Sequence, residues 1–447
     1  MTNTHGSFQG GLRDTFANII NVKEEIWPDL PNDAIVNLER GGKRTIHNLH
    51  SYPSKFVPQL PRWAIKKYSS KGDTVLDPFV GSGTTMVEAQ LAGRNSFGMD
   101  INPLAVLISK VKTTPIESHI RHARTVEIMN AITRDKSADY PSPHFRNRDF
   151  WFKKQTSKTL AMILHHISQV PEDDMRDFLL VCFSSIIGRV SNVASGQILQ
   201  ARRGKIKSKP SMSRKKIIAL FKQVVKSSLS LLDEYVKNIP EHVSAKAITE
   251  DARNLDPKKW AGQVDLIITS PSYINAIDYI WADKLRLHWL GLAKNDSERL
   301  KLMRQQIGTE NISSVEYRYL PEKIGIKALD QNIAKIYNAT EYRASDNQNQ
   351  LRAHVVYRYF RDIETHFQKA YEVLPKGAYY CFVMGDNSIC KVKIPTYRFF
   401  YEIAERIGFR EIFKFSLILK NRLLNLPRNV EWADIIPYDR MIVLKKD

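Results

Sequence analysis

The stretch that decides the fold reads Thr-Val-Leu-Asp-Pro-Phe-Val-Gly-Ser-Gly-Thr-Thr and occupies residues 74–85. Its first part is a short apolar run typical of a buried strand, and this run ends at Asp77-Pro78. A Gly-x-Gly turn at Gly81 and Gly83 follows, with serine and threonine residues around it that can cap a helix. The sequence therefore predicts a strand, a tight turn and a helix. The turn would lie at the carboxyl end of the strand, where open α/β sheets bind ligands.

The segments around this stretch alternate between strand and helix patterns. The expected elements are a strand at 74–77, a helix at 82–92, a strand at 96–100 and a helix at 103–111. This order indicates a parallel sheet covered by helices. Strand patterns return at 245–249, 264–269, 378–384, 411–419 and 440–445, with helices expected at 351–374 and 396–407. We therefore expect one α/β sheet that collects all of these strands.

Two long segments interrupt the alternation. Residues 113–241 are mostly helical in periodicity, with helices expected at 159–170, 175–190 and 215–236, and residues 292–350 are polar and expected to be loop-rich and mobile. At the amino terminus, residues 12–27 predict an amphipathic helix that leads into a proline-rich turn. The expected organisation is an N-terminal segment with the first half of the sheet domain at 1–112, a helical insertion at 113–241, and the second half at 242–447.

The composition indicates a globular chain that binds a polyanion. The 447 residues carry a net charge of +20, and lysines and arginines displace the counterions condensed on nucleic-acid phosphates. The densest basic run supplies the candidate phosphate contacts, namely Arg202, Arg203, Lys205, Lys207 and Lys209. No apolar run has the length of a membrane span, no secretory signal is visible, and the three cysteines lack metal-ligand spacing. We therefore expect a cytoplasmic protein without a metal site.

Two sequence motifs carry the chemistry. In the first, Gly81 and Gly83 would let a ligand approach the backbone, and the helix that starts near Thr84 would favour an anionic group at its amino-terminal end. In the second, the apolar strand at 265–269 runs into Ser270-Pro271-Ser272-Tyr273. Both motifs follow strands of the same expected sheet, so we expect them to meet at its carboxyl edge.

Together the two motifs resemble the cofactor loop and the catalytic tip of the DNA N4-cytosine and N6-adenine amino-group methyltransferases. The resemblance implies a Rossmann-like methyltransferase sheet, mostly parallel with an antiparallel strand near the carboxyl terminus, and S-adenosyl-L-methionine as the cofactor. In this family the acid that closes the second strand binds the ribose, which points to Asp100. The acid after the third strand contacts the adenine, which points to Asp251, although Glu250 is its neighbour. The implied cofactor-binding set is Lys55, Asp77, Phe79, Gly81, Gly83, Thr84, Asp100, Asn102 and Asp251.

The second motif resembles the family's catalytic tip. An exocyclic amine is a poor nucleophile, because its lone pair is delocalised into the ring. Acceptors placed around the amine would draw it toward tetrahedral geometry. By resemblance, Ser270 and Pro271 supply those acceptors, and Tyr273 stacks on a flipped-out base. Ser272 stands where the family usually has a second proline, so we expect a looser tip with activity retained.

The activity that the resemblance implies is methylation of double-stranded DNA. Cytosine N4 is favoured as the target because serine is the first residue of the tip. Adenine N6 remains open, as do an RNA amino-methyltransferase and an inactive DNA-binding relative. A nicotinamide dehydrogenase is disfavoured because the loop lacks the third glycine of Gly-x-Gly-x-x-Gly. The expected partners are duplex DNA and a cognate restriction endonuclease, and the recognition of the DNA sequence is expected within residues 113–241 or, as a second candidate, 292–350.

Overall fold

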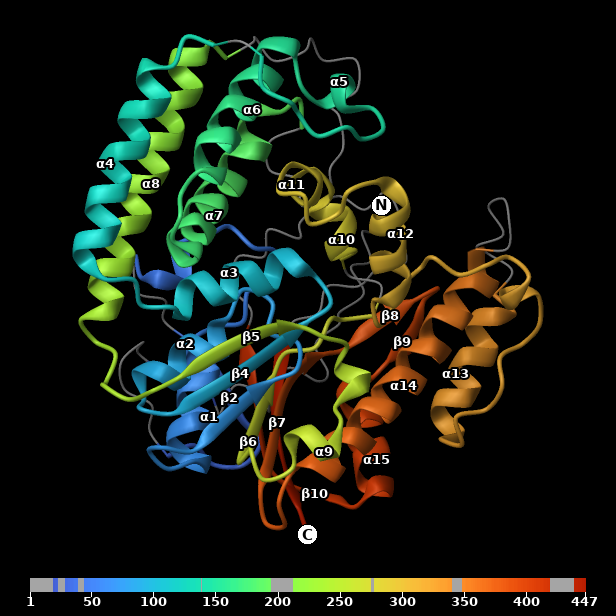
Figure 1. Ribbon diagram of the computed structural model, residues 1–447. Coiled ribbons are helices and arrows are strands. Elements are labelled where there is room, and N and C mark those ends of the chain that lie inside the picture. Colours follow the sequence, from blue (N-terminus) through green and yellow to red (C-terminus); the bar gives the residue numbers. More distant parts are fainter. Residues whose placement is uncertain are drawn as a thin grey trace, which may run out of the picture.

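The computed structural model describes residues 19–22, 29–38, 44–137, 139–193, 212–274, 277–339, 348–418 and 438–447. A nine-stranded sheet lies at its centre, in the order β1-β2-β10-β11-β7-β6-β3-β4-β5 (Figure 1). The strands are β1 (Ile19–Val22), β2 (Ala34–Leu38), β3 (Thr74–Asp77), β4 (Asn95–Asp100), β5 (Ala245–Thr249), β6 (Leu266–Thr269), β7 (Tyr379–Gly385), β10 (Phe409–Ile418) and β11 (Tyr438–Lys446). A separate hairpin pairs β8 (Asn387–Ile389) with β9 (Val392–Ile394).

Strand β11 runs against the direction of the rest of the sheet. It pairs antiparallel with both β10 and β7. The other neighbouring strands pair in parallel. The predicted fold class, a mostly parallel α/β sheet with an antiparallel strand near the carboxyl terminus, is confirmed.

Successive residues of the strands face opposite layers of helices, as the two-residue period of a strand requires. On one face, Val75 and Ile268 belong to the core that α1 (Gln59–Tyr68) and α2 (Thr84–Leu91) cover. On the other face, Leu76 and Ile267 pack in the core that includes α14 (Gln348–Val373) and α15 (Thr396–Ile407). The strands are therefore buried on both sides, which explains why they read as continuous apolar runs.

A third apolar core lies within the helical part of the chain. Its helices are α3 (Pro103–Thr113), α4 (Ser118–Arg134), α6 (Lys154–Ser168), α7 (Asp173–Val190), α8 (Arg214–Val236) and α11 (Lys284–Trp289), with the short α5 (Arg148–Trp151) beside them. Figure 1 shows α4, α6, α7 and α8 grouped together, with α3 between this group and the sheet. The helices expected within 113–241 are thus present, while the division into domains stays a prediction. No helix of the described residues is both long and apolar enough to cross a bilayer.

The prediction for the amino-terminal segment was wrong where the structure describes it. Residues 19–22, expected inside a helix, form β1, and residues 34–38 form β2 where only a proline-rich lead-in was expected. Strand β2 pairs with both β1 and β10. Its residues alternate between buried and half-buried, so the strand is stabilised by partners that lie far away in the sequence.

The prediction of a loop-rich segment at 292–350 was also wrong in part. This segment holds α12 (Asp296–Gln305) and α13 (Lys327–Tyr337), and the short helices α9 (Pro257–Trp260) and α10 (Tyr279–Ala282) precede it. In α13 the buried residues Leu329, Ile333 and Ile336 recur at helical spacing and join the core around α14. Polar residues between them hid this stripe from a reading based on composition.

The crowding around Gly98 in β4 generates a stability prediction. A Cβ atom at Gly98 would lie 2.5 Å from Met86 Sδ and 2.5 Å from Val80 Cγ2. Gly98→Ala should therefore lower the free energy of unfolding by about 1–3 kcal/mol, because the packed neighbours must move. Urea denaturation measures the change.

Gly188, in the interior of α7, is the matched control. A Cβ atom there would meet no heavy atom closer than 4.0 Å. Gly188→Ala should raise the free energy of unfolding by up to about 1 kcal/mol, because alanine is the better helix former. A Gly98→Ala variant as stable as the wild type would show that Met86 and Val80 pack less tightly against β4 than described.

Candidate active site

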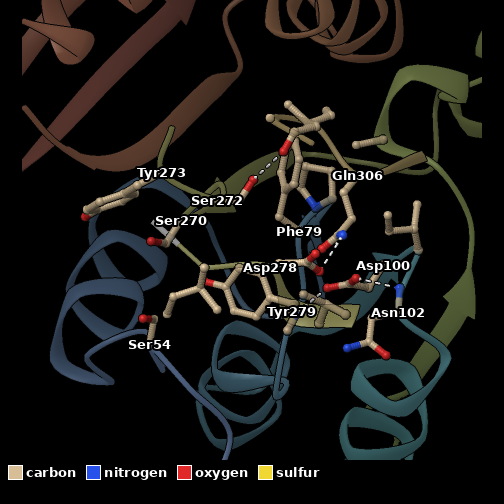
Figure 2. Close-up of a pocket in the computed structure, with 18 of the residues that line it drawn as sticks. Ser54, Phe79, Asp100, Asn102, Ser270, Ser272, Tyr273, Asp278, Tyr279 and Gln306 are labelled. Carbon is tan, nitrogen blue, oxygen red and sulfur yellow. Dashed lines mark hydrogen bonds between the residues drawn. The ribbon is translucent and has the colours of Figure 1, made fainter. Parts of the chain in front are cut away.

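The two sequence motifs converge on one cavity at the carboxyl edge of the sheet. Its volume is about 550 Å³, and its walls come from the ends of β3, β4, β5 and β6 and from segments around residues 52–56, 277–281, 305–310 and Arg352. Figure 2 shows Ser270 and Tyr273 on one side of this cavity and Asp100 and Asn102 on the other, with Phe79 and Tyr279 between them. The predicted residues that line it are Lys55, Asp77, Phe79, Gly81, Thr84, Asp100, Asn102, Asp251, Ser270 and Tyr273.

Gly83 and Pro271 were predicted as site residues but do not line the cavity. Gly83 has φ +78°, and a Cβ atom there would lie 2.9 Å from Ser109 Oγ of α3. The glycine is therefore needed for the turn and for the close approach of α3. Its contact with a ligand stays a prediction. Pro271 is buried, and its backbone separates Ser270 from Ser272 at the cavity wall.

Asp77 links the ends of the two central strands. Its carboxylate accepts hydrogen bonds from Thr85 Oγ1 at 2.6 Å and from Thr269 Oγ1 at 2.7 Å, and the backbone N–H of Phe79 donates to it at 3.1 Å. Thr85 belongs to the helix after the loop, and Thr269 is the last residue before Ser270. Burial raises the pKa of Asp77 to about 6, against the effect of these donors. The carboxylate thus fixes the loop relative to the catalytic tip.

Asp100 presents its carboxylate to the cavity at the end of β4. One oxygen accepts a hydrogen bond from Gly81 N at 3.0 Å, and the other accepts from Asn102 N at 2.8 Å (Figure 2). A carboxylate offers about four acceptor positions, so these backbone donors leave capacity for hydroxyl donors of a ligand. Burial, together with the nearby charges of Asp77 and Asp283, raises the pKa of Asp100 to about 6, against the effect of the two backbone donors.

Two buried hydroxyls of the loop indicate where an anionic group would bind. Ser82 Oγ and Thr84 Oγ1 have no hydrogen-bond partner among the described residues, and both side chains line the cavity. Buried polar atoms are rarely left unsatisfied, so this pair points to a ligand. Lys55 lies in the same wall, where its ammonium donates to His47 O at 2.9 Å. Two hydroxyls and a cation at a helix amino terminus fit the carboxylate of an amino-acid ligand.

The catalytic tip is held by hydrogen bonds from three directions. Ser272 Oγ donates to Ile307 O at 3.2 Å, and Tyr359 Oη of α14 donates to Ser272 O at 2.8 Å. Tyr273 Oη donates to Asp439 Oδ1 of β11 at 2.7 Å. The expectation that Ser272 loosens the tip does not agree with these contacts, because the serine hydroxyl adds a tether that a proline lacks.

The predicted adenine contact, Asp251, is already engaged within the protein. The Arg253 guanidinium donates to Asp251 from Nη2 at 2.6 Å and from Nε at 3.0 Å, and the same arginine bridges to Asp362 of α14. Glu250 also lines the cavity. The choice between these two acids for a ligand contact therefore stays open.

Several lining residues were missed by the sequence reading. They come from the segments before the loop and after the tip, and the clearest are Tyr52, Asp278, Tyr279, Gln306 and Arg352. Gln306 Nε2 donates to Asp278 Oδ1 at 2.9 Å across the cavity wall (Figure 2). Asp278 also caps α10 through Trp281 N, the one local signal that marked it. Tyr52 lies in the segment with Lys55 that the resemblance already covered. Tyr279, Gln306 and Arg352 carry no sequence signal, because their position depends on how distant segments pack.

The charge of the cavity is opposite to that of the whole chain. The carboxylates in its walls are Asp77, Asp100, Glu250, Asp251, Asp278 and Glu310, and the cations are Lys55 and Arg352. The chain as a whole has a net charge of +20. A cavity with this surplus of acids favours a ligand that carries positive charge, whereas the remaining surface favours a polyanion. The predicted phosphate contacts Arg202, Arg203, Lys205, Lys207 and Lys209 lie outside the described residues.

The raised pKa of Asp100 predicts a specific dependence of stability on pH. Because the pKa of about 6 lies above the value of 3.8 for an unperturbed carboxyl, the folded chain takes up this proton first as the pH falls from 8 toward 5. Protonation of Asp100 therefore favours the folded state in that window, and Asp100→Asn lacks this gain. The thermal midpoint of the variant relative to the wild type should be highest at pH 8 and should fall toward pH 5.

Asp29→Asn provides the control for this measurement, because Asp29 is fully exposed. It makes the same change of net charge at a position outside the cavity, so the pH dependence of Asp100→Asn is compared with that of Asp29→Asn. The same pH dependence in the two variants would mean that the Asp100 carboxyl titrates as it does in water.

Comparison with known proteins finds similarity to DNA methyltransferases. A family model described as DNA methylase, of the N6/N4 type, matches residues 20–111. The type II methyltransferase M.MvaI of Kocuria varians is 24% identical over 417 residues, which cover 88% of this chain and 88% of that protein. The type II methyltransferase M.BsoBI of Geobacillus stearothermophilus is 25% identical over 425 residues, covering 86% of this chain and 83% of the relative.

The likeness to solved structures is weak by comparison. The rRNA methyltransferase aviRa from Streptomyces viridochromogenes aligns over 89% of this chain and 88% of its own, with 10% identity and a TM-score of 0.31. The assignment therefore depends on the sequence matches and on the cavity that joins the two motifs. Residues 20–111 thus match the N6/N4-type DNA methylases, and most of the chain is similar to type II methyltransferases.

Proposed function

We propose that the protein transfers a methyl group from S-adenosyl-L-methionine to the exocyclic amine of a base in double-stranded DNA, at cytosine N4. The observation that carries this proposal is the single cavity lined by both Asp100 and Ser270. A ribose-binding acid and an amine acceptor in one cavity are what the transfer requires. The bound cofactor would supply an electrophilic methyl group on a positively charged sulfur, and the surplus of acids in the walls suits that charge.

The residues of the chain fit the cofactor in three parts. The Ser82 and Thr84 hydroxyls, buried without partners among the described residues, would accept or donate at the amino-acid end together with Lys55. Asp100 would accept hydrogen bonds from the ribose hydroxyls, because its carboxylate is oriented by Gly81 N and Asn102 N. Phe79, which lines the same cavity as Asp251, would offer an aromatic face to the adenine.

The catalytic tip would act on the base. Ser270 Oγ would accept a hydrogen bond from the amine, which pulls its lone pair out of conjugation with the ring. The Pro271 carbonyl, the second acceptor that the resemblance implies, would have to be reached beside Ser270, because Pro271 itself does not line the cavity. Tyr273 would stack on the flipped-out base, with its hydroxyl fixed by Asp439. The tethers from Ile307 and Tyr359 would hold these acceptors in place, and rigid placement is the main contribution a protein makes to such a transfer.

The biological setting we propose is a restriction–modification system. The relatives that match most of the chain are named type II methyltransferases, which supports a cognate endonuclease as the partner. The choice of cytosine is supported by the serine that leads the tip. The experiment below separates cytosine N4 from adenine N6 and from RNA.

The product of the reaction tests the proposal directly. The protein is incubated with unmethylated duplex DNA or with RNA, each with S-adenosyl-L-methionine that carries a deuterated methyl group, and the nucleic acid is digested to nucleosides for mass spectrometry. We expect labelled N4-methylcytosine from the duplex. Labelled N6-methyladenine would overturn the choice of base, and label in RNA alone would overturn the choice of substrate. Cofactor binding without transfer would indicate an inactive relative.

Ser270→Ala should lower kcat by about 100-fold, because one acceptor of the amine is lost from a preorganised site. The dissociation constant for S-adenosyl-L-methionine should stay unchanged, since Ser270 lies across the cavity from Asp100. Ser272→Ala is the matched variant: it removes a hydroxyl that tethers the tip to Ile307, and its loss of kcat should be smaller. Equal losses in the two variants would contradict a direct role for Ser270.

The basic run is proposed to contact DNA phosphates. Arg202→Glu combined with Arg203→Glu should raise KM for duplex DNA and reduce the slope of log affinity against log salt by about 2, because roughly one counterion is released per phosphate contact. The control reverses Lys71 and Lys258, exposed residues that precede β3 and β6 and so lie away from the cavity edge. An equal rise in KM with the control pair would show that only net charge matters.

A further inference from the structure

The segment that follows the catalytic tip contains a fully buried carboxylate, that of Asp283. It lies between α10 and α11 with an exposed fraction of 0%. One oxygen accepts a hydrogen bond from Asn102 Nδ2 at 3.0 Å, and the other accepts from Arg286 Nη1 at 2.7 Å. A buried charge is costly unless it is paired and hydrogen-bonded, and both of these partners are placed to satisfy it. Asp283 therefore joins residues after the tip to a residue of the cofactor half, across 181 positions of sequence.

Asn102 transmits this contact to the cofactor site. Its side-chain oxygen accepts a hydrogen bond from Leu104 N and so caps α3, while its side-chain nitrogen donates to Asp283. Both ends of the Asn102 amide are thus fixed. When the amide nitrogen faces Asp283, the amide oxygen faces Leu104 N and caps α3. The backbone N–H of the same residue donates to Asp100 Oδ1. The position of the Asp100 carboxylate thus depends on the turn that Asp283 secures.

A second contact ties the same segment to the loop. The rings of Tyr279 and Tyr52 stack with centroids 5.8 Å apart and an interplanar angle of 12°. Tyr52 in turn lies against Gly81, where a Cβ atom would be 3.5 Å from Tyr52 Cε1, and its hydroxyl is 3.4 Å from Asn102 Nδ2. Tyr279 therefore connects this segment to the loop through Tyr52, and Asp283 connects it to the turn at Asn102.

We propose that Asp283 is a positioning residue for the cofactor: it fixes the Asn102 amide and, through the turn at residues 100–102, the ribose-binding carboxylate of Asp100. The inference rests on the proposed function, since it takes Asp100 as a cofactor contact. It extends that function by making the segment beyond the catalytic tip a required part of the cofactor site.

An exchange of the two side chains provides a test with internal rescue. Asn102→Asp places two carboxylates in contact and removes the donor, and should weaken S-adenosyl-L-methionine binding by about 100-fold. Asp283→Asn leaves Arg286 facing an amide, and should weaken binding by about tenfold. In the double variant, the carboxylate at position 102 can still cap α3 and accept from the amide at position 283, whose oxygen can accept from Arg286. Binding should then return to within about fivefold of the wild type, because each hydrogen bond has a counterpart.

The readouts separate positioning from folding. Calorimetry gives the dissociation constant for S-adenosyl-L-methionine, and thermal unfolding without ligand gives stability. KM for DNA should change little in the variants, because the tip is held by other contacts. Asp135→Asn is the matched control, since Asp135 is a nearly buried carboxylate bonded to Tyr140 and His166 in the helical part. It should lower the midpoint of unfolding and leave cofactor binding unchanged.

The outcomes decide between this inference and the proposed function. A wild-type protein that does not bind S-adenosyl-L-methionine refutes the proposed function. A wild type that binds it, with Asp283→Asn binding equally well or with a folded double variant that binds no better than Asp283→Asn, overturns the role of Asp283. If Asn102→Asp does not fold, the comparison of Asp283→Asn with the double variant still decides.

Discussion

The carboxylate of Asp77 joins the two halves of the site, and the remaining geometry depends on it. It accepts hydrogen bonds from Thr85 after the loop and from Thr269 before the tip, and Thr269 lies 192 positions from Asp77 in the sequence. Parallel pairing of β3 with β6 brings the two strand ends together. The Asp77 carboxylate then fixes the position of the loop after β3 relative to the residues after β6. Burial of this charge is unfavourable, which its raised pKa reflects, and three donors offset the cost.

The distribution of charge divides the protein into two environments. The cavity concentrates carboxylates in a chain whose net charge is +20. A cationic cofactor and a polyanionic substrate, as proposed, would thus be attracted to different parts of one molecule. This separation suits a transfer between two ligands that must be held side by side.

The segments between the sheet strands do more than connect them. Residues 277–310 supply cavity walls, tether Ser272 through Ile307 and secure Asn102 through Asp283. Helix α14, which follows the second insertion, holds the same tip through Tyr359. A segment whose composition suggested a mobile loop is therefore part of the support of the site. Rigid support of this kind matters because small displacements of reacting groups carry a large cost in rate.

The sequence by itself determined the fold class, the two motifs and the strands and helices directly around them. Strand β3 falls at the expected residues 74–77, and most predicted cofactor and tip residues line one cavity, because these features are encoded in short contiguous patterns. Tertiary structure decided what depends on distant partners. Strand β2 exists through its pairing with β1 and β10, Gly83 serves the packing of α3, and Asp251 is engaged by Arg253. Asp283 and Tyr279 join the site only when the chain folds, since a contact between residues far apart in sequence leaves no local pattern to read.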